Sequence, residues 1–308
     1  MAAPSRRVPG LYSPTVLGAI LTAMVTPFDA ELKVDEGATA RLARHLVDEG
    51  ASEGLVVAGT TGEASTLDDE EKLTLVRIAA REVGDRASIV GGAGSNDTDH
   101  SVRLAERMGE AGADAILAVT PYYNKPPRAG LLAHFEAIAR VGVPVVLYNI
   151  PGRTAVNMPP DLIAEIAELP GVIALKEAND DPAQRAGVAG IEGLDLYAGN
   201  DDMLLPVLEL GGAGVISVAS HLVGPEMAAM VAAARRADWD EARRIDADLA
   251  GLVAGLFMTS NPILIKAALA MAGLIPDDAL RLPLVPATPV ERSVLKTVLG
   301  RHVALTNT

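Results

Sequence analysis

Residues 144–149 read Pro-Val-Val-Leu-Tyr-Asn, and residues 171–176 read Gly-Val-Ile-Ala-Leu-Lys. Each is a short, almost continuously apolar run that ends in a polar side chain. Such runs are typical of parallel strands that are covered on both faces, whereas strands with one solvated face alternate between apolar and polar residues. The segment between the two runs is long enough for a crossover helix, so the two stretches together predict one βαβ unit.

The same unit recurs in both directions along the chain. Each short apolar run is followed by a longer stretch with helical periodicity, as in residues 35–48. Eight consecutive units predict an α/β fold of the TIM-barrel type, a closed (β/α)₈ barrel. An open, doubly wound sheet is the alternative. The predicted strands are 16–25, 54–58, 87–91, 115–119, 144–149, 172–176, 194–198 and 214–218.

After the eighth predicted strand the pattern becomes purely helical, which predicts an α-helical appendage packed on the barrel. We therefore expect an N-terminal extension over residues 1–15, a barrel core over 16–224 and C-terminal helices over 225–308. Two arginines precede the first apolar run, as in a secretory signal. The run lacks a small-residue cleavage pattern, so it is interpreted as the first strand.

Composition excludes several classes of protein. The net charge of −14 opposes binding to nucleic acid, because an acidic chain repels phosphates. No apolar run approaches the roughly 20 residues of a membrane span, so we expect a cytoplasmic protein with no membrane partner. The chain has no cysteine, which excludes disulfides and thiolate nucleophiles. Its five histidines show no metal-ligand spacing, so we expect no metal and no cofactor.

Lys176 is the first candidate for chemistry, because barrel enzymes place their active sites at the carboxyl ends of the strands. It ends the strand 172–176, so its aliphatic stem is expected inside the barrel mouth. A lysine there either pairs with a carboxylate, such as Glu177 or Asp201, or loses its proton easily. Burial lowers the pKa of a lysine, and a neutral amine can form an imine with a carbonyl compound. Position alone leaves both interpretations open.

Three of the five tyrosines, Tyr122, Tyr123 and Tyr148, also fall at predicted strand ends. A phenol both donates and accepts hydrogen bonds, so it can relay protons, although packing at the barrel rim is the alternative. Residues 59–63 read Gly-Thr-Thr-Gly-Glu, a loop whose amides and hydroxyls can hold a carboxylate. Arg153 can bind a second carboxylate through its planar guanidinium, or it can form a salt bridge within its loop.

Six motifs, in this order along residues 16–300, resemble those of the dihydrodipicolinate synthase family. The six are Gly59-Thr-Thr-Gly-Glu63, Val119-Thr-Pro-Tyr-Tyr-Asn124, Leu147-Tyr-Asn-Ile-Pro-Gly-Arg-Thr154, Leu175-Lys-Glu-Ala178, Gly214-Val-Ile-Ser217 and Asn261-Pro-Ile263 followed by Lys266. The resemblance implies a pyruvate-dependent class I lyase on a (β/α)₈ barrel. It also implies a homo-oligomer, usually a tetramer built as a dimer of dimers.

The resemblance further implies that Lys176 forms an imine with pyruvate, which loses a methyl proton to give an enamine. The enamine would attack the aldehyde of aspartate 4-semialdehyde, and the adduct would cyclise to 4-hydroxy-tetrahydrodipicolinate on the path to lysine and diaminopimelate. Tyr148, Thr60 and Tyr123 would form a proton relay, with Tyr123 reaching in from a neighbouring subunit.

The substrate pocket is also assigned by resemblance. Thr61, Gly199 and Ile216 would line the pyruvate pocket, and Arg153 would bind the carboxylate of the semialdehyde. Related pyruvate-dependent aldolases, which act on keto-deoxy sugar acids or hydroxy-oxoglutarate, share the lysine and the tyrosine. Arg153 favours the synthase, because the sugar-acid lyases generally lack an arginine there. A non-catalytic barrel paralogue is a third alternative, which the full set of residues disfavours.

Two segments depart from the family pattern. After the seventh predicted strand the chain reads Gly199-Asn200-Asp201, where the family often has Gly-Asp-Asp. In lysine-inhibited members, two histidines and a glutamate help to bind the effector, and the matching residues here are Asp69, Lys72 and His100. The ammonium of Lys72 would repel the ammonium of a bound lysine. The resemblance therefore implies weak or absent feedback inhibition by lysine.

Overall fold

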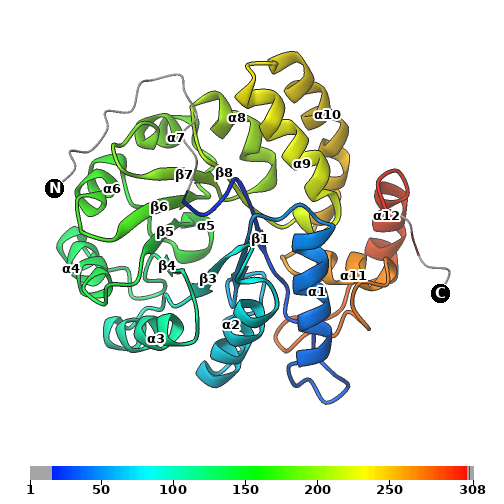
Figure 1. The fold of residues 1–308 in the computed structure, drawn as a ribbon, viewed down its shortest axis with the longest axis horizontal. Helices are drawn as coiled ribbons and strands as arrows, with labels where there is room; N and C mark the ends of the chain where they lie inside the picture. Colours follow the sequence, from blue (N-terminus) through cyan, green and yellow to red (C-terminus); the bar gives the residue numbers. More distant parts are fainter. Residues whose placement is uncertain (1–15, 304, 306–308) are drawn as a thin grey trace.

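The sheet closes on itself. The computed structural model describes residues 16–303 and 305, so the predicted N-terminal extension over 1–15 lies outside the described residues. Within the described residues, eight parallel strands pair in sequence order and β8 pairs with β1 (Figure 1). This confirms the (β/α)₈ barrel and excludes the open sheet. The strands are β1 (Ile20–Ala23), β2 (Gly54–Val57), β3 (Ser88–Gly92), β4 (Ala115–Val119), β5 (Val145–Asn149), β6 (Val172–Glu177), β7 (Asp195–Ala198) and β8 (Gly214–Ser217).

The first strand is shorter than the apolar run that predicted it. Gly18 adopts a φ of +93°, and a Cβ there would lie 2.4 Å from the Cβ of Glu53, so the chain turns sharply against its neighbour before it enters the sheet. Beyond the strand, Met24 and Val25 remain buried in the core without a strand conformation. Apolar character alone therefore overestimated the length of β1.

The helices begin where the sequence supplies capping groups. Asp68 caps α2 by accepting from the Glu71 amide, and the Glu71 side chain accepts from the Asp68 amide in return. The helices are α1 (Glu36–Asp48), α2 (Asp69–Val83), α3 (Thr98–Glu110), α4 (Arg128–Ala139), α5 (Pro151–Thr154), α6 (Pro160–Ala167), α7 (Pro182–Val188), α8 (Leu204–Glu209), α9 (Ser220–Arg235), α10 (Trp239–Leu256), α11 (Ile263–Met271) and α12 (Pro289–Leu299), with a 3-10 turn η1 (Asp201–Met203).

Two separate groups of buried side chains form the core. Because side chains alternate along a strand, Ala174 and Ala178 of the β6 region point into the barrel, together with Tyr148 and Ile216 from other strands. Leu175 points outward, into the larger apolar layer between the barrel and its helices. Lys176 shares the inward parity of Ala174, and this places its side chain inside the barrel.

The last helices cover one side of the barrel. α9 begins at Ser220 rather than at the predicted Pro225, and the backbone is non-helical at Val223, where φ is −132°. The regular part of α9 thus starts beside Pro225, as expected for a proline near a helix start. α9 contacts β1, α1 and α8, so it belongs to the ring of barrel helices.

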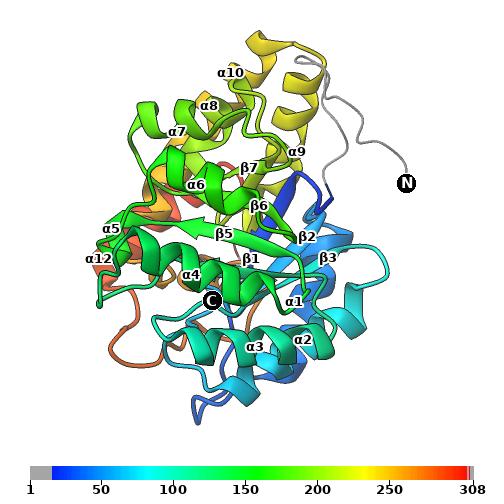
Figure 2. The same ribbon diagram turned by 90° about the vertical axis from the view of Figure 1, so that its left-hand side faces the viewer.

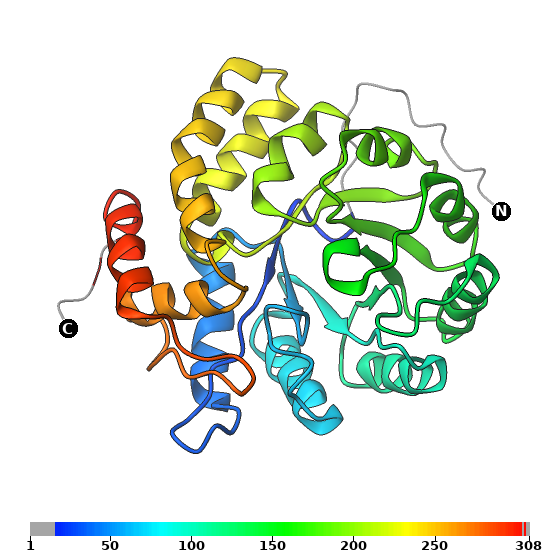
Figure 3. The ribbon, with the colours of Figure 1, turned by 180° about the vertical axis from the view of Figure 1, so that it is seen from behind.

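α10, α11 and α12 lie together beside α1 and α9, and Figure 2 shows them against the barrel rather than apart from it. The short helix α5 lies over the opening of the barrel (Figure 3). No helix in the described part of the chain combines the length and the apolar character needed to cross a bilayer.

Candidate active site

Lys176 lies inside the barrel at the end of β6 and is only 5% exposed. Tyr148 is its register partner on β5, and the Lys176 Nζ lies 4.5 Å from the centre of the phenol ring. Burial lowers the pKa of Lys176 to about 8, against the charge of Asp201, which raises it, while Arg153 lowers it further. Roughly one molecule in ten would then carry a neutral amine at pH 7.

The alternative interpretation of Lys176, a structural ion pair, finds no support among the residues that the structure describes. Lys176 takes part in none of the ion pairs, with nitrogen and oxygen within 4 Å, that these residues form. Asp201 is buried, and its carboxylate accepts hydrogen bonds from the Ser217 hydroxyl and from the amides of Val218 and Ala219. Asp201 therefore acts on Lys176 through its charge and not through contact.

Glu177 lies on the outer face of β6, where it fixes the strand that carries Lys176. The Asn149 amide donates to both of its oxygens at 3.0 and 3.1 Å, the Asn179 backbone amide donates at 2.9 Å and the Gln184 amide at 3.1 Å. Burial raises the pKa of Glu177, and these hydrogen bonds oppose the rise. Because Asn149 and Glu177 are register partners, their bond holds Tyr148 level with Lys176 on the inner face.

Tyr148 is buried, and burial raises the pKa of its phenol to about 12, while the charge of Arg153 and a hydrogen bond with Thr60 oppose the rise. The phenol is therefore protonated at neutral pH and hydrogen-bonded to the Thr60 hydroxyl. Thr61, the next residue in the loop after β2, is buried, and its hydroxyl oxygen accepts from the Asn261 amide at 2.8 Å. The structure thus brings Lys176, Tyr148 and Thr60 together, and Thr61 follows Thr60 in the loop.

A cavity of about 460 Å³ opens beside this cluster. Thr60, Tyr148 and Arg153 line it, together with Tyr122. Arg153 sits on α5, and its Nη2 donates to the Asn261 carbonyl at 3.4 Å. Among the ion pairs of the described residues, none engages Arg153, so its guanidinium remains available to an anion in the cavity.

Ile216 and Gly199 occupy the barrel interior and its rim. Ile216 is buried in the inner core, beside Tyr148. The Gly199 amide donates to the Glu177 carbonyl at 2.7 Å, and a Cβ at Gly199 would lie 2.6 Å from the Cβ of Ala178. A glycine is therefore required there for β6 and β7 to approach each other closely.

Of the predicted site residues, Thr60, Tyr148 and Arg153 line the cavity, whereas Lys176, Thr61, Gly199, Ile216 and Tyr123 are not among the residues that line it. Tyr123 is 89% exposed and adopts a left-handed φ of +72°. Its neighbour Tyr122 is 39% exposed and faces the cavity instead.

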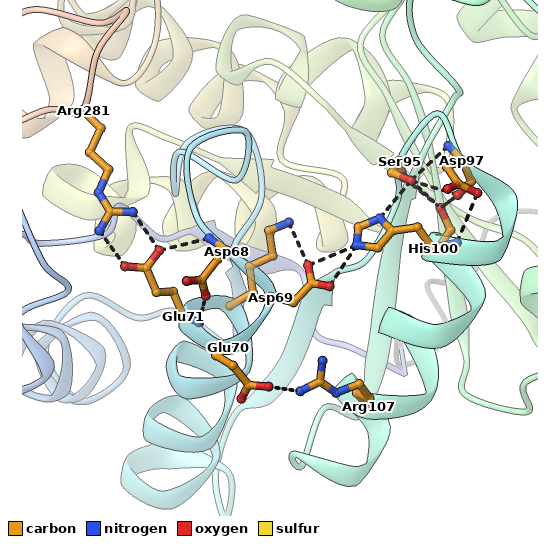
Figure 4. A network of polar contacts seen from close by, with 11 residues as sticks. Asp68, Asp69, Glu70, Glu71, Ser95, Asp97, His100, Arg107 and Arg281 are labelled. Atoms are coloured by element: carbon orange, nitrogen blue, oxygen red, sulfur yellow. Dashed lines mark hydrogen bonds and ion pairs between the residues drawn. The ribbon is translucent and has the colours of Figure 1, made fainter.

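Three residues, Asp69, Lys72 and His100, match the effector-binding positions of lysine-inhibited family members. They lie where α2 meets α3, and Figure 4 shows Asp69 and His100 there. The Asp69 carboxylate lies 3.0 Å from His100 Nε2 and 3.6 Å from Lys72 Nζ. Burial raises the pKa of Asp69, but the hydrogen bond and charge of His100 and the charge of Lys72 outweigh it and lower that pKa. Lys72 and His100 line the same cavity as Arg153.

The buried ion pair of a second lysine, Lys266, was not predicted from the sequence. Its ammonium lies 2.8 Å from the Glu63 carboxylate, and both side chains are inaccessible to solvent. The signal was present, because a lysine within the otherwise apolar helix α11 cannot reach water. The sequence identifies Glu63 only as the last residue of the glycine-flanked loop.

The described residues contain no group of three or more histidine, aspartate or glutamate side chains placed to hold a metal ion. The groups gathered around Lys176 are an amine, a phenol, hydroxyls and a guanidinium. Such a set suits proton transfer and imine formation on a substrate that carries carboxylates.

Comparisons with known proteins agree on one family. Residues 16–301 match the dihydrodipicolinate synthetase family. A 4-hydroxy-tetrahydrodipicolinate synthase of Heliobacterium modesticaldum is 46% identical over 288 residues, which cover 92% of this chain and 95% of the relative. A dihydrodipicolinate synthase structure from Bacillus anthracis has a TM-score of 0.89 at 38% identity, covering 93% of this chain and 98% of that chain. The enzyme of Cyanidioschyzon merolae, solved with lysine bound, has a TM-score of 0.89 at 39% identity and coverages of 92% and 98%.

Proposed function

This chain belongs to the dihydrodipicolinate synthetase family, as its six motifs predicted, and on that premise we propose that it condenses pyruvate with aspartate 4-semialdehyde. It is a lyase of the Schiff-base type, with Lys176 as the amine that forms the imine. The observation that carries the proposal is the buried position of Lys176 against the ring of Tyr148, which lines the same cavity as Arg153.

The first half of the reaction uses the inner face of the barrel. The neutral amine of Lys176 adds to the keto carbon of pyruvate, and the resulting carbinolamine loses water to give the imine. Tyr148 is protonated at neutral pH, so it can donate a proton to the departing hydroxyl and recover one through its hydrogen bond with Thr60. Removal of a methyl proton then gives the enamine. In this proposal the Thr61 hydroxyl holds the pyruvate carboxylate, and Ile216 and Gly199 line the remainder of the pyruvate pocket.

The second half of the reaction joins the enamine to the aldehyde. The enamine carbon attacks the aldehyde carbon, and the oxygen that becomes negative takes a proton from Tyr148. The amino group of the semialdehyde then adds to the imine carbon and expels the lysine amine, which closes the ring and frees the enzyme. Arg153 binds the carboxylate of the semialdehyde from α5, which favours this acceptor over sugar acids that lack a carboxylate at that distance.

We further propose that the active form is a homo-oligomer, a tetramer built as a dimer of dimers. The exposure of Tyr123 supports this, because a neighbouring subunit would cover a large aromatic side chain that its own chain leaves open. Exposed apolar residues on the C-terminal segment, Leu282, Val285 and Val290, add surface that a second copy of the chain would cover. Within the tetramer, Tyr123 of a neighbouring subunit would complete the Thr60–Tyr148 relay.

Borohydride trapping tests the proposed chemistry. Reduction in the presence of pyruvate is expected to add one pyruvyl group to each chain, and peptide mapping is expected to locate it on Lys176. Turnover is then compared across aspartate 4-semialdehyde, other small aldehydes and keto-deoxy sugar acids, with the semialdehyde expected to give the highest kcat/KM. A missing adduct would refute the imine, whereas an adduct with a faster sugar-acid reaction would point to the related aldolases.

Feedback by lysine is expected to be weak or absent. Lys72 places an ammonium at the matching effector position, and Asp69 is already engaged by His100 and Lys72. Initial rates should therefore change less than twofold, by our estimate from like-charge repulsion, when millimolar lysine is added. Replacing Lys72 with histidine removes the repelling charge and provides the comparison. Half-inhibition of the unmodified enzyme by sub-millimolar lysine would contradict the expectation.

A further inference from the structure

The ion pair between Lys266 and Glu63 is fully buried and joins α11 to the loop that carries Thr60. Lys266 Nζ donates to Glu63 Oε1 at 2.8 Å and to the Thr26 carbonyl at 2.9 Å, and it lies 4.3 Å from the centre of the Phe28 ring. The exposed fractions of the two side chains are 0% and 1%. The two groups are paired with each other and closed off from solvent, so neither takes part in the proposed chemistry directly.

Glu63 holds the turn that contains the two threonines. Its backbone amide donates to the Thr60 carbonyl at 3.1 Å, and its carbonyl accepts from the Thr66 amide at 3.0 Å. Glu63 adopts a left-handed φ of +58°, which is unfavourable for a residue with a Cβ. The contacts of its side chain with α11 and with the Arg281 amide, at 3.1 Å, keep the residue in that conformation.

A second contact from the same helix reaches the neighbouring threonine. Asn261 lies just before α11, and its amide donates to the Thr61 hydroxyl at 2.8 Å. The loop is therefore held at two points, at Thr61 by Asn261 just before α11 and at Glu63 by Lys266 within α11. A shift of α11 would move Thr60 relative to Tyr148 of β5, to which Thr60 is hydrogen-bonded.

The energetics argue against stability as the purpose of the pair. Taking two charges out of water is costly, and well-packed apolar residues of similar size are often as stabilising as a buried ion pair. The pair instead fixes the orientation of the Glu63 side chain, because each carboxylate oxygen accepts from one fixed donor, the Lys266 ammonium and the Arg281 amide. An apolar pair would fill the space without fixing the turn.

We propose that Lys266 and Glu63 are positioning residues, which fix the Thr60–Thr61 loop against α11 and thereby set the rate of the reaction at Lys176. This deepens the proposed function and rests on it. The C-terminal helices would then be part of the catalytic apparatus, although they contribute no group to the cavity. A misplacement of about 1 Å at such a position costs on the order of a hundredfold in rate.

The test uses a variant that leaves no buried charge unpaired. Lys266→Met with Glu63→Gln removes both charges and retains an oxygen that can accept from the Arg281 amide. After circular dichroism and thermal unfolding establish that it is folded, kcat/KM is expected to fall by roughly 10- to 100-fold. The same double substitution is then made in a Thr60→Val background. If the ion pair acts through Thr60, the double substitution should lower kcat/KM of the Thr60→Val enzyme by less than about threefold.

A matched control comes from another ion pair between helices, Arg243 of α10 with Glu209 of α8, which has no contact with the loop and does not act on Lys266. Arg243→Met with Glu209→Gln is expected to leave kcat/KM unchanged. An equal loss of kcat/KM with and without the Thr60 hydroxyl, or no loss at all, would overturn the positioning role. Borohydride trapping in the wild type would still succeed in that case, so the proposed function would stand. Failure of trapping in the wild type would overturn the proposed function, and the positioning role with it.

Discussion

Lys176→Met is expected to abolish turnover and, at the same time, to stabilise the folded protein. Removal of a covalent nucleophile lowers kcat by more than about 10,000-fold. The lysine is buried without a contacting carboxylate, and burial lowers its pKa from 10.5 to about 8. That shift corresponds to at most about 3 kcal/mol of unfavourable free energy below pH 8, which methionine, with a similar shape and no charge, would remove.

The sign of the pH dependence follows from the same shift. Between pH 8 and 10.5 the unfolded chain holds a proton that the folded chain has lost, so the wild type gains stability as the pH rises through this window. The advantage of Lys176→Met, measured by denaturant unfolding, should therefore shrink over that range. Lys266→Met provides the control: it leaves Glu63 buried and unpaired, so it is expected to destabilise by about 3–5 kcal/mol. Residual turnover in Lys176→Met would exclude the covalent role.

Arg153→Ala is expected to separate the two halves of the reaction. The variant should still form the pyruvyl adduct on Lys176, whereas kcat/KM for aspartate 4-semialdehyde should fall on the order of 100- to 1,000-fold. Two charge-assisted hydrogen bonds to a carboxylate contribute about this much. Loss of the guanidinium also removes a charge that lowers the pKa of both Lys176 and Tyr148, so the pH–rate profile should move to higher pH.

The measurements are borohydride trapping and steady-state kinetics on the same preparations. Arg128→Ala is the matched control, because Arg128 is an exposed arginine paired with Asp161 and Glu165, away from the cavity. It should behave as the wild type. Arg153→Lys keeps the charge without the planar fork and should recover only part of the rate. Undiminished turnover in Arg153→Ala would show that the acceptor carboxylate is bound elsewhere.

The barrel and much of the candidate site could be predicted from short-range patterns. Continuous apolar runs located all eight strands, since burial on both faces removes the need for polar residues. Its place at the end of a predicted strand then put Lys176 inside the barrel mouth, and loop position put Arg153 near the same mouth. The outward direction of Glu177 was not predicted, since Glu177 remained a possible partner of Lys176. The strand ends were less certain, because Met24 and Val25 are buried by tertiary packing that no strand pattern encodes.

What could not be predicted depends on contacts between distant segments. The pair of Lys266 and Glu63 joins residues 203 positions apart, and nothing local to either one indicates the other. The role of Asp201 likewise depends on amides of Val218 and Ala219 that β8 brings beside it. The exposure of Tyr123 concerns a surface that a single chain leaves open. Such relations are set by the closure of the barrel rather than by the sequence around each residue.

The position of Arg153 on α5 has a consequence for how this enzyme can change. In the proposed mechanism the imine chemistry belongs to the sheet, where Lys176 and Tyr148 are register partners and a change to either one costs the reaction its nucleophile or its proton donor. The proposed contact with the acceptor comes instead from a four-residue helix on a loop, outside the strand ladder. Mutations in α5 can therefore explore new aldehydes while the nucleophile stays intact. A lineage with this arrangement can diverge in substrate by small steps, and each intermediate still folds and still forms its enamine.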